Sequence, residues 1–264
     1  MGRYLLKFTK EKNLKYISHL DLLRLFQRAF KRGGISLSYS KGYNPHPKMG
    51  FAQPLSLGTE SFGEYLEFET DEQRTGEYYR DIMSGCMPDG ISILSCSDMK
   101  QSGKTSAAAA VAYASYIVKG DISEEAKALL LDGIPKYINQ DEIICRKINK
   151  KKKLVENNIK PLIRSFNTGK TDHTEISDNT CHTENSDNSI KQDNSEKPSE
   201  SEIVFSMTLR TGSNGNLNPE VLIKSLCEFC NVEYLRHEWN YLRQEMYFQV
   251  DGSENLLPLS EFKG

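Results

Sequence analysis

The sequence has 264 residues and a formal net charge of −2; hydrophobic residues make up 38% of it and charged residues 27%. This composition is ordinary for a globular protein and excludes collagen-like and low-complexity chains. No stretch approaches the roughly 20 apolar residues that span a bilayer, and the first residues lack the pattern of a secretory signal. We therefore expect a cytoplasmic protein with no membrane contact.

The small net charge hides a strong asymmetry along the chain. Residues 1–59 contain eleven lysines and arginines but only two acids, a net charge of +9. Residues 168–202 contain nine acids and three lysines, a net charge of −6. A basic region of this density is typical of proteins that bind polyanions. The segment 168–201 nearly lacks large apolar side chains, so we expect it to be a disordered acidic linker.

The first hundred residues predict six elements. Ser18 offers an N-cap, the apolar spacing from residue 19 to residue 32 predicts a helix, and Gly33 and Gly34 end it. The expected elements are a strand at 3–10, this helix, strands at 35–40 and 63–70, a helix at 78–86 and a strand at 90–95. The order β-α-β-β-α-β is that of the ferredoxin-like fold.

The remainder of the chain predicts a second, looser copy of this order. The expected elements are a strand at 108–119, a helix at 123–133, strands at 142–147, within 153–166 and at 201–210, a helix at 219–230 and a strand at 245–250. We therefore expect an α+β protein with two ferredoxin-like (βαββαβ) modules in tandem, at residues 1–100 and 105–264. The acidic linker at 168–201 interrupts the second module.

One face of the first predicted helix carries charges at helical spacing. Its members are Asp21, Arg24, Arg28 and Lys31, with Arg32 adjacent. Guanidinium and ammonium groups in a row can follow a phosphate backbone, and each counterion that they release adds salt-sensitive affinity. An ordinary solvated helix face with an Asp21–Arg24 pair is the alternative. The basic surroundings favour an RNA-binding interpretation of this face.

The loop after this helix combines rigidity with groups that contact RNA. Pro45 and Pro47 restrict its backbone, and Gly42 permits a tight turn. The loop presents Tyr39, Lys41, Tyr43, Asn44, His46 and Lys48. Rings that stack on bases, amides that bind base edges and cations that bind phosphates are what single-stranded RNA recognition uses. A structural hairpin with its tyrosines turned inward is the alternative.

Two histidines are the candidate catalytic residues. His19 at the helix start and His46 in the loop would act as general base and acid on a ribose 2′-hydroxyl if the fold brings them together. The chain contains no cluster of metal-ligand motifs and no three-cysteine iron–sulfur motif. Cys227 and Cys230 form an isolated C-x-x-C in an apolar helix, which favours two buried thiols. We therefore expect no metal and no cofactor.

Two features lie apart from the N-terminal region. The basic run at residues 147–153 is either a solvated hairpin tip or an auxiliary RNA contact. Trp239, the only tryptophan, is expected in the core or in an interface.

Four short motifs resemble a known signature: S-H-L-D-L-x-R at residues 18–24, Y-S-x-G-x-N-P-x-P at 39–47, P-L-x-x-G at 54–58 and a glutamate at 64. Together they are similar to the radical-SAM-linked bacterial family of unknown function, found alone or fused behind a radical SAM module. The resemblance implies a radical SAM enzyme, encoded nearby, as a partner. It supplies no catalytic residue, because no activity is settled for that family.

These observations predict an accessory protein of a radical SAM enzyme that binds RNA, either tRNA or rRNA, through its basic N-terminal module. A binding protein is favoured over an enzyme. Two alternatives stay open: a metal-independent endoribonuclease that uses His19 and His46, and a protein-only scaffold that docks the radical SAM partner.

Overall fold

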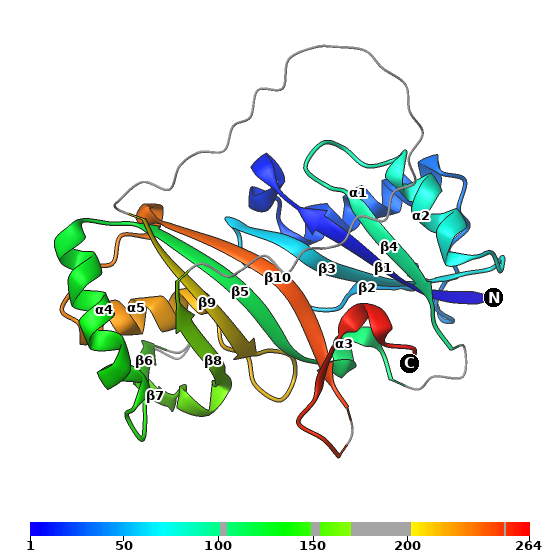
Figure 1. Ribbon diagram of the computed structural model, residues 1–264. Coiled ribbons are helices and arrows are strands. Elements are labelled where there is room, and N and C mark those ends of the chain that lie inside the picture. Colours follow the sequence, from blue (N-terminus) through cyan, green and yellow to red (C-terminus); the bar gives the residue numbers. More distant parts are fainter. Residues whose placement is uncertain (101–104, 149–153, 170–201, 251) are drawn as a thin grey trace, which may run out of the picture.

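The computed structural model describes residues 1–100, 105–148, 154–169, 202–250 and 252–264. Four helices in this part of the chain exceed two turns: α1 (His19–Arg32), α2 (Gly76–Ser84), α4 (Glu124–Ile138) and α5 (Pro219–Phe229). The described strands form one nine-stranded mixed sheet and a separate two-stranded hairpin. In Figure 1 the sheet runs across the molecule, with α1 and α2 at one end and α4 and α5 at the other.

The first half of the chain contributes four strands to the sheet. They are β1 (Gly2–Lys10), β2 (Met49–Phe51), β3 (Thr59–Thr70) and β4 (Ile93–Asp98). Their order is β4-β1-β3-β2, and every neighbouring pair is antiparallel. Because side chains alternate across a strand, Tyr4, Leu6 and Phe8 of β1 all point to one face and pack with α1 and α2.

The second half repeats this order of strands. Its strands are β5 (Val111–Asp121), β8 (Ile163–Thr168), β9 (Glu202–Arg210) and β10 (Trp239–Gln249), arranged β10-β5-β9-β8 with antiparallel neighbours. The smaller elements are α3 (Ala107–Ala110), the hairpin of β6 (Ile144–Ile148) and β7 (Leu154–Asn158), and β11 (Leu256–Pro258) beside β10. When the four strands of each half are counted along the chain, both halves place them in the sheet in the order fourth, first, third, second.

The two halves share the sheet through one short parallel pairing. Tyr241, Leu242 and Arg243 of β10 lie beside Thr59, Glu60 and Ser61 of β3. The protein is therefore a mixed α/β structure with one large sheet and few helices. The predicted boundary between the modules falls at residues 101–104, outside the described residues.

Helix α1 forms where its sequence predicts it. The Ser18 side chain accepts a hydrogen bond from the backbone N–H of Asp21, as an N-cap does. Leu22, Phe26 and Phe30 recur three to four residues apart and are buried against β1 and β3. The helix ends at Arg32, with Gly33 as its C-cap.

The predicted second strand is wrong in position. Residues 35–40 make only isolated bridges, Leu37 to Thr70 and Tyr39 to Pro47, and the strand that pairs with β3 is β2. Pro45 and Pro47 lack the N–H group that a ladder needs, so pairing resumes only beyond them. The prediction placed the strand before the proline loop because the alternation of ISLSYS is stronger than that of MGF.

Several other elements differ from their predicted bounds, and the three clearest differences lie in the second half of the chain. Helix α4 continues past Gly133 and through Pro135 to Ile138. Strand β10 begins at Trp239 and not at residue 245. The alternation of apolar residues did not predict this start, because one of the buried positions is the polar Arg243. The segment 153–166 contains β7 and the start of β8 rather than one strand.

Two predicted features lie largely outside the described residues: most of the acidic linker at 168–201 and the lysines at 150–153 of the second basic run.

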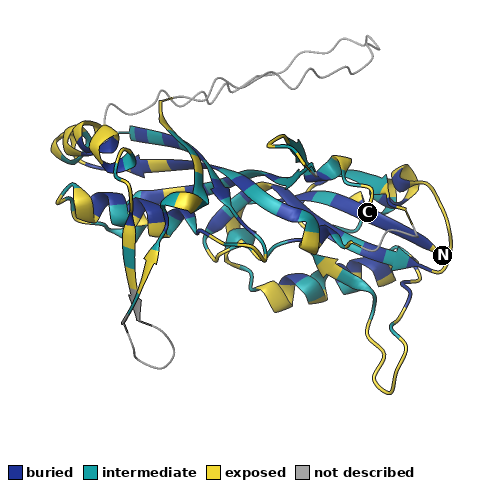
Figure 2. Ribbon diagram, turned by 90° about the horizontal axis from the view of Figure 1, so that it is seen from below, coloured by how far each residue is buried: buried dark blue, intermediate teal, exposed yellow. Residues whose placement is uncertain are grey.

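Trp239 is confirmed as a core residue and is 1% exposed. In Figure 2 the strands are largely dark blue and teal, and the helices beside them carry yellow on part of their surface. None of the described helices is long and apolar enough to cross a membrane.

Candidate nucleic-acid interface on helix α1

A groove of about 600 Å³ runs along one side of α1. The helix contributes Arg24, Arg28 and Lys31, and the following loop contributes Tyr39 and Pro47. The tertiary structure thus brings the two sequence-predicted RNA-binding features, the basic helix face and the loop, to one surface. We call this surface the α1 groove.

A second groove, of about 370 Å³, lies on the other side of the same helix. Arg24 and Arg28 line it as well, together with Asp21, Arg32 and Pro88. The two arginines therefore form a ridge between the grooves. An anionic chain in either groove would lie next to their guanidinium groups.

The motif at residues 18–24 forms the start of α1. The Ser18 hydroxyl donates a hydrogen bond of 2.7 Å to the Asp21 carboxylate, which also accepts one of 2.9 Å from Arg24. The Ser18 hydroxyl and then the Arg24 guanidinium hold the pKa of Asp21 below its usual value. Because the pKa of Asp21 is lower in the folded than in the unfolded protein, its carboxylate stabilises the fold at pH values above the unfolded pKa. This stabilisation is lost as the pH falls through the pKa of the folded protein.

We expect Ser18→Ala to lower the free energy of unfolding by about 1 kcal/mol, because it removes the N-cap of α1. Urea unfolding of both proteins at neutral pH measures the change. Ser18→Asn, which keeps a capping side chain, is the matched control and should stay close to the wild type. Equal losses in the two variants would contradict a capping role.

The loop between residues 38 and 48 is an irregular hairpin. The Ser40 N–H donates to the His46 carbonyl at 2.9 Å, and the Lys48 N–H donates to the Ser38 carbonyl at 2.8 Å. The His46 N–H donates to Ser40 Oγ at 3.0 Å. Gly42, at a φ of +143°, occupies the positive-φ region that the sequence predicted for it. These bonds tie the base of the loop and leave its tip exposed.

The side chains at the tip of the loop point to solvent. Tyr43 is fully exposed and Tyr39 is 56% exposed, so these tyrosines do not pack inward as the structural alternative required. Lys41, Asn44 and His46 are also exposed. Of the loop side chains predicted to contact RNA, only Tyr39 lines the α1 groove.

Six of the eleven cations of residues 1–59 form ion pairs among the described residues, five of them with acids from elsewhere in the fold. Lys48 pairs with Glu69 at 2.6 Å, although the sequence analysis counted it as a free RNA-binding cation. The other ion pairs are Arg3–Glu67, Lys7–Glu245, Lys12–Asp89, Lys15–Glu60 and Arg24–Asp21. The net charge of +9 is therefore a property of the sequence segment and not of a continuous surface.

The remaining cations of this segment gather on α1 and in the loop. Lys10 is buried, and burial lowers its pKa. Arg32 donates to the backbone carbonyl of Cys86 at 2.5 Å. Within the described part of the chain, Arg28, Lys31 and Lys41 have no ion-pair partner. Two of these three, Arg28 and Lys31, line the α1 groove.

The two candidate catalytic histidines occupy different surroundings. The ring of His19 packs edge-on against Phe51, with centroids 5.3 Å apart. His46 lies in the exposed hairpin, where its backbone, and not its ring, forms the contact with Ser40. Among the described residues no contact joins the two rings.

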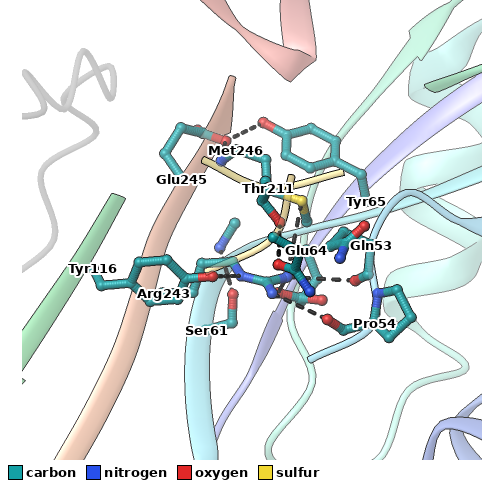
Figure 3. A network of polar contacts seen from close by, with 12 residues as sticks. Gln53, Pro54, Ser61, Glu64, Tyr65, Tyr116, Thr211, Arg243, Glu245 and Met246 are labelled. Atoms are coloured by element: carbon teal, nitrogen blue, oxygen red, sulfur yellow. Dashed lines mark hydrogen bonds and ion pairs between the residues drawn. The ribbon is translucent and has the colours of Figure 1, made fainter. Parts of the chain in front are cut away.

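The end of the signature lies at the junction of the two halves. Glu64 of β3 and Arg243 of β10 form an ion pair of 2.9 Å, with side chains only 4% and 3% exposed. Arg243 also donates to the Pro54 carbonyl at 3.1 Å and to the Tyr116 hydroxyl at 3.3 Å (Figure 3). Arg236 donates to the carbonyl of Gly58 at 3.5 Å. These contacts give Pro54, Gly58 and Glu64 a role in joining the halves.

A second carboxylate completes this junction. Glu245 accepts a hydrogen bond of 2.6 Å from the Tyr65 hydroxyl (Figure 3). It also accepts one of 2.5 Å from Lys7 Nζ. Its Oε1 also accepts from the backbone N–H of Met246 at 2.8 Å. No local pattern in the sequence predicts this network, because its members are separated by up to 238 residues.

Cys227 is buried and Cys230 is partly buried. Burial raises the pKa of the Cys227 thiol to about 12, so this thiol is unreactive at neutral pH. Among the described residues, no group of three or more His, Cys, Asp or Glu side chains is placed to hold a metal ion.

Three polar residues that were not predicted as site residues also line the α1 groove. Gln27 and Ser36 line it, and so does Asp71, whose carboxylate accepts a hydrogen bond of 2.7 Å from Ser38. Gln27 lies three residues after Arg24 and four before Lys31, so helical spacing was a usable signal for it. No local signal predicts Asp71, which follows β3 and reaches the groove only through the fold.

Comparison with solved structures shows a similarity to a chain in the "Crystal Structure of a Cbf5-Nop10-Gar1 Complex", with 9% sequence identity and a TM-score of 0.42. The similarity covers 92% of this protein and 48% of that chain, so this protein spans about half of its length. No curated protein matches the sequence. Residues 3–219 match the bacterial family described as "Uncharacterized protein conserved in bacteria (DUF2344)". Because this match covers most of the sequence, the protein belongs to that bacterial family.

Proposed function

We propose that the protein is an RNA-binding accessory protein of a radical SAM enzyme and that the α1 groove is an RNA contact. One observation carries the RNA part of this proposal. Arg28 and Lys31, which have no ion-pair partner among the described residues, line a single groove with the exposed ring of Tyr39. Cations beside an exposed aromatic ring are the combination that single-stranded RNA binding uses.

The exposed pair of Asp21 and Arg24 is compatible with this function. The two side chains are 55% and 64% exposed, and exposed ion pairs contribute little to stability. A phosphate can therefore compete for Arg24 at small cost. The tip of the loop, with Tyr43 and Lys41, extends the same surface into solvent.

We expect Arg28→Ala/Lys31→Ala to weaken binding of an unstructured RNA of about 20 nucleotides by about tenfold or more at low salt. Both side chains are exposed, so the fold should be unaffected. The slope of log Kd against log salt should fall by about 1.4, since each lost phosphate contact on a single strand removes about 0.7. Fluorescence anisotropy with labelled RNA over a series of salt concentrations measures both quantities.

Lys136→Ala/Lys224→Ala is the matched control. It removes the same charge from exposed positions on α4 and α5 and should bind RNA as the wild type does. If the two double variants lose affinity equally, the effect is one of net charge and the α1 groove is not the binding site. If the wild type binds no RNA, the RNA part of the proposal is wrong.

The radical SAM partner follows from the resemblance of the four motifs at residues 18–64. Affinity purification of the full chain from its native host, with and without nuclease treatment, tests it. Recovery of a radical SAM enzyme supports the partnership. Recovery that resists nuclease and high salt, together with no RNA binding, would instead identify the protein-only scaffold.

The endoribonuclease alternative requires His19 and His46 at one phosphodiester. RNA incubated with the pure protein and EDTA would then yield fragments with 2′,3′-cyclic ends. We expect intact RNA, and cleavage that His46→Ala abolishes would establish the enzyme instead.

We also infer that each half of the chain is a ferredoxin-like module. The repeated strand orders β4-β1-β3-β2 and β10-β5-β9-β8 support this interpretation. The two modules would then be fused edge to edge through β3 and β10.

A further inference from the structure

One face of the sheet in the second half carries a cluster of polar and aromatic side chains. Ala114 and Tyr116 of β5 point into the core that β5 shares with α4 and α5. Because side chains alternate, Tyr113 and Ser115 point to the opposite face. On β9, Arg210 lies directly beside Tyr113 in the antiparallel register. We call the surface around Tyr113 the sheet face.

Two guanidinium groups lie close to the Tyr113 ring. The Cζ atom of Arg210 is 5.0 Å from the ring centroid and that of Arg164 is 5.4 Å from it. Arg210 also donates a hydrogen bond of 2.8 Å to the Tyr113 hydroxyl. Arg164 donates one of 2.7 Å to the backbone carbonyl of Glu254. These contacts hold both cations in place at one ring.

Neither guanidinium has a carboxylate partner among the described residues. Other cations on this face of the sheet are neutralised: Lys119 pairs with Glu202 at 3.1 Å, and Lys7 pairs with Glu245. Like charges held this close repel each other, and a bound anion relieves the repulsion. Arg164 is exposed, and Tyr113 and Arg210 are partly exposed, so an anion can reach them. Arg210 also borders a hollow of about 920 Å³.

The neighbouring positions are small and polar or aromatic. Tyr247 of β10 is in register with Tyr113, and its hydroxyl lies 3.3 Å from Ser115 Oγ. Thr208 of β9 is in register with Ser115. Hydroxyl groups can bind base edges and 2′-hydroxyls, while the two tyrosines offer ring faces.

We propose that the sheet face is a second contact for single-stranded RNA, in which a base stacks against the cluster of Tyr113, Arg164 and Arg210 and the two arginines neutralise phosphates. This inference rests on the proposed RNA-binding function and extends it to the second half of the chain. Aromatic rings and arginines on an open surface bind single strands with little sequence preference. Two guanidiniums that have no carboxylate partner among the described residues favour a polyanionic ligand over a neutral surface.

The test compares variants of the full chain for binding to the same RNA of about 20 nucleotides. Arg164→Ala/Arg210→Ala should lower the slope of log Kd against log salt by about 1.4. Tyr113→Leu should weaken binding by about tenfold, whereas Tyr113→Phe, which keeps the ring, should bind as the wild type does. Lys136→Ala/Lys224→Ala on the opposite side of the sheet is the control for charge. Urea unfolding confirms that each variant is folded.

The outcomes separate this inference from the α1 groove. If only Arg28→Ala/Lys31→Ala weakens binding and the sheet-face variants match the control, the sheet face is not an RNA contact and the α1 groove stands. If only the sheet-face variants weaken binding, this inference holds and the proposal that the α1 groove contacts RNA is wrong. If Tyr113→Phe loses as much affinity as Tyr113→Leu, the ring is not a stacking platform. If the wild type binds no RNA, both contacts are wrong.

Discussion

Arg243→Met is expected to lower the free energy of unfolding by about 3–5 kcal/mol. The substitution leaves the Glu64 carboxylate, 4% exposed, without the guanidinium that now pairs with it at 2.9 Å. An uncompensated buried charge costs far more than the lost contact itself. The Tyr116 hydroxyl and the Pro54 carbonyl lose a donor in the same step. Urea unfolding measures the change as a shift of the midpoint.

The double variant Glu64→Leu/Arg243→Met separates the buried charge from the loss of packing. It removes both charges and should be more stable than Arg243→Met alone. Arg80→Met, which removes an exposed ion pair with Asp81, is the control and should leave the midpoint nearly unchanged. If Arg243→Met shifts the midpoint no more than Arg80→Met, the junction does not depend on this ion pair.

Trp239→Ala is expected to lower the free energy of unfolding by about 3–5 kcal/mol, because it removes buried contacts and leaves a cavity. The Trp239 ring is 1% exposed and stacks near Phe205 and Tyr234, with centroids 6.0 and 6.3 Å away. The space left behind is enclosed by β5, β9 and β10, whose hydrogen bonds prevent them from closing over it. Urea unfolding with a fixed m-value measures the loss.

Gly120 provides an internal check on this packing. A Cβ at Gly120 would lie 2.7 Å from Cζ3 of Trp239, so Gly120→Ala should cost about 1–3 kcal/mol in the wild type. In the Trp239→Ala background the ring is gone and Ile203 Cγ2, at 3.0 Å, stays close to this Cβ, so the same substitution should cost clearly less. A double-mutant cycle measures this coupling. Additive costs would show that the two residues do not compete for the same space.

Local patterns in the sequence predicted the features that depend on neighbouring residues. The start of α1 follows from Ser18, three positions before Asp21, and its buried face follows from the spacing of Leu22, Phe26 and Phe30. The exposed hairpin follows from its glycine and prolines. The sequence predicted a strand at 35–40, whereas the strand that pairs with β3 is β2. Both segments lie near β3, and local alternation does not show which of them pairs with it.

The candidate site divides in the same way. Arg28 and Lys31 were found because they are spaced along one helix, and the structure places Tyr39 beside them in the α1 groove. The sheet face was not found, because Tyr113, Arg164 and Arg210 come from three strands and meet only across β5, β8 and β9. No periodicity within a single segment contains them.

By itself, the sequence determined the basic and aromatic character of residues 18–48, because composition and helical spacing are local properties. Only the tertiary structure decided which of those charges are available. It pairs Lys48 with Glu69, Lys7 with Glu245 and Arg3 with Glu67, acids that lie 21, 238 and 64 residues away. Coulomb attraction acts through space rather than along the chain, so a charge count over a segment cannot predict the free charge of a surface.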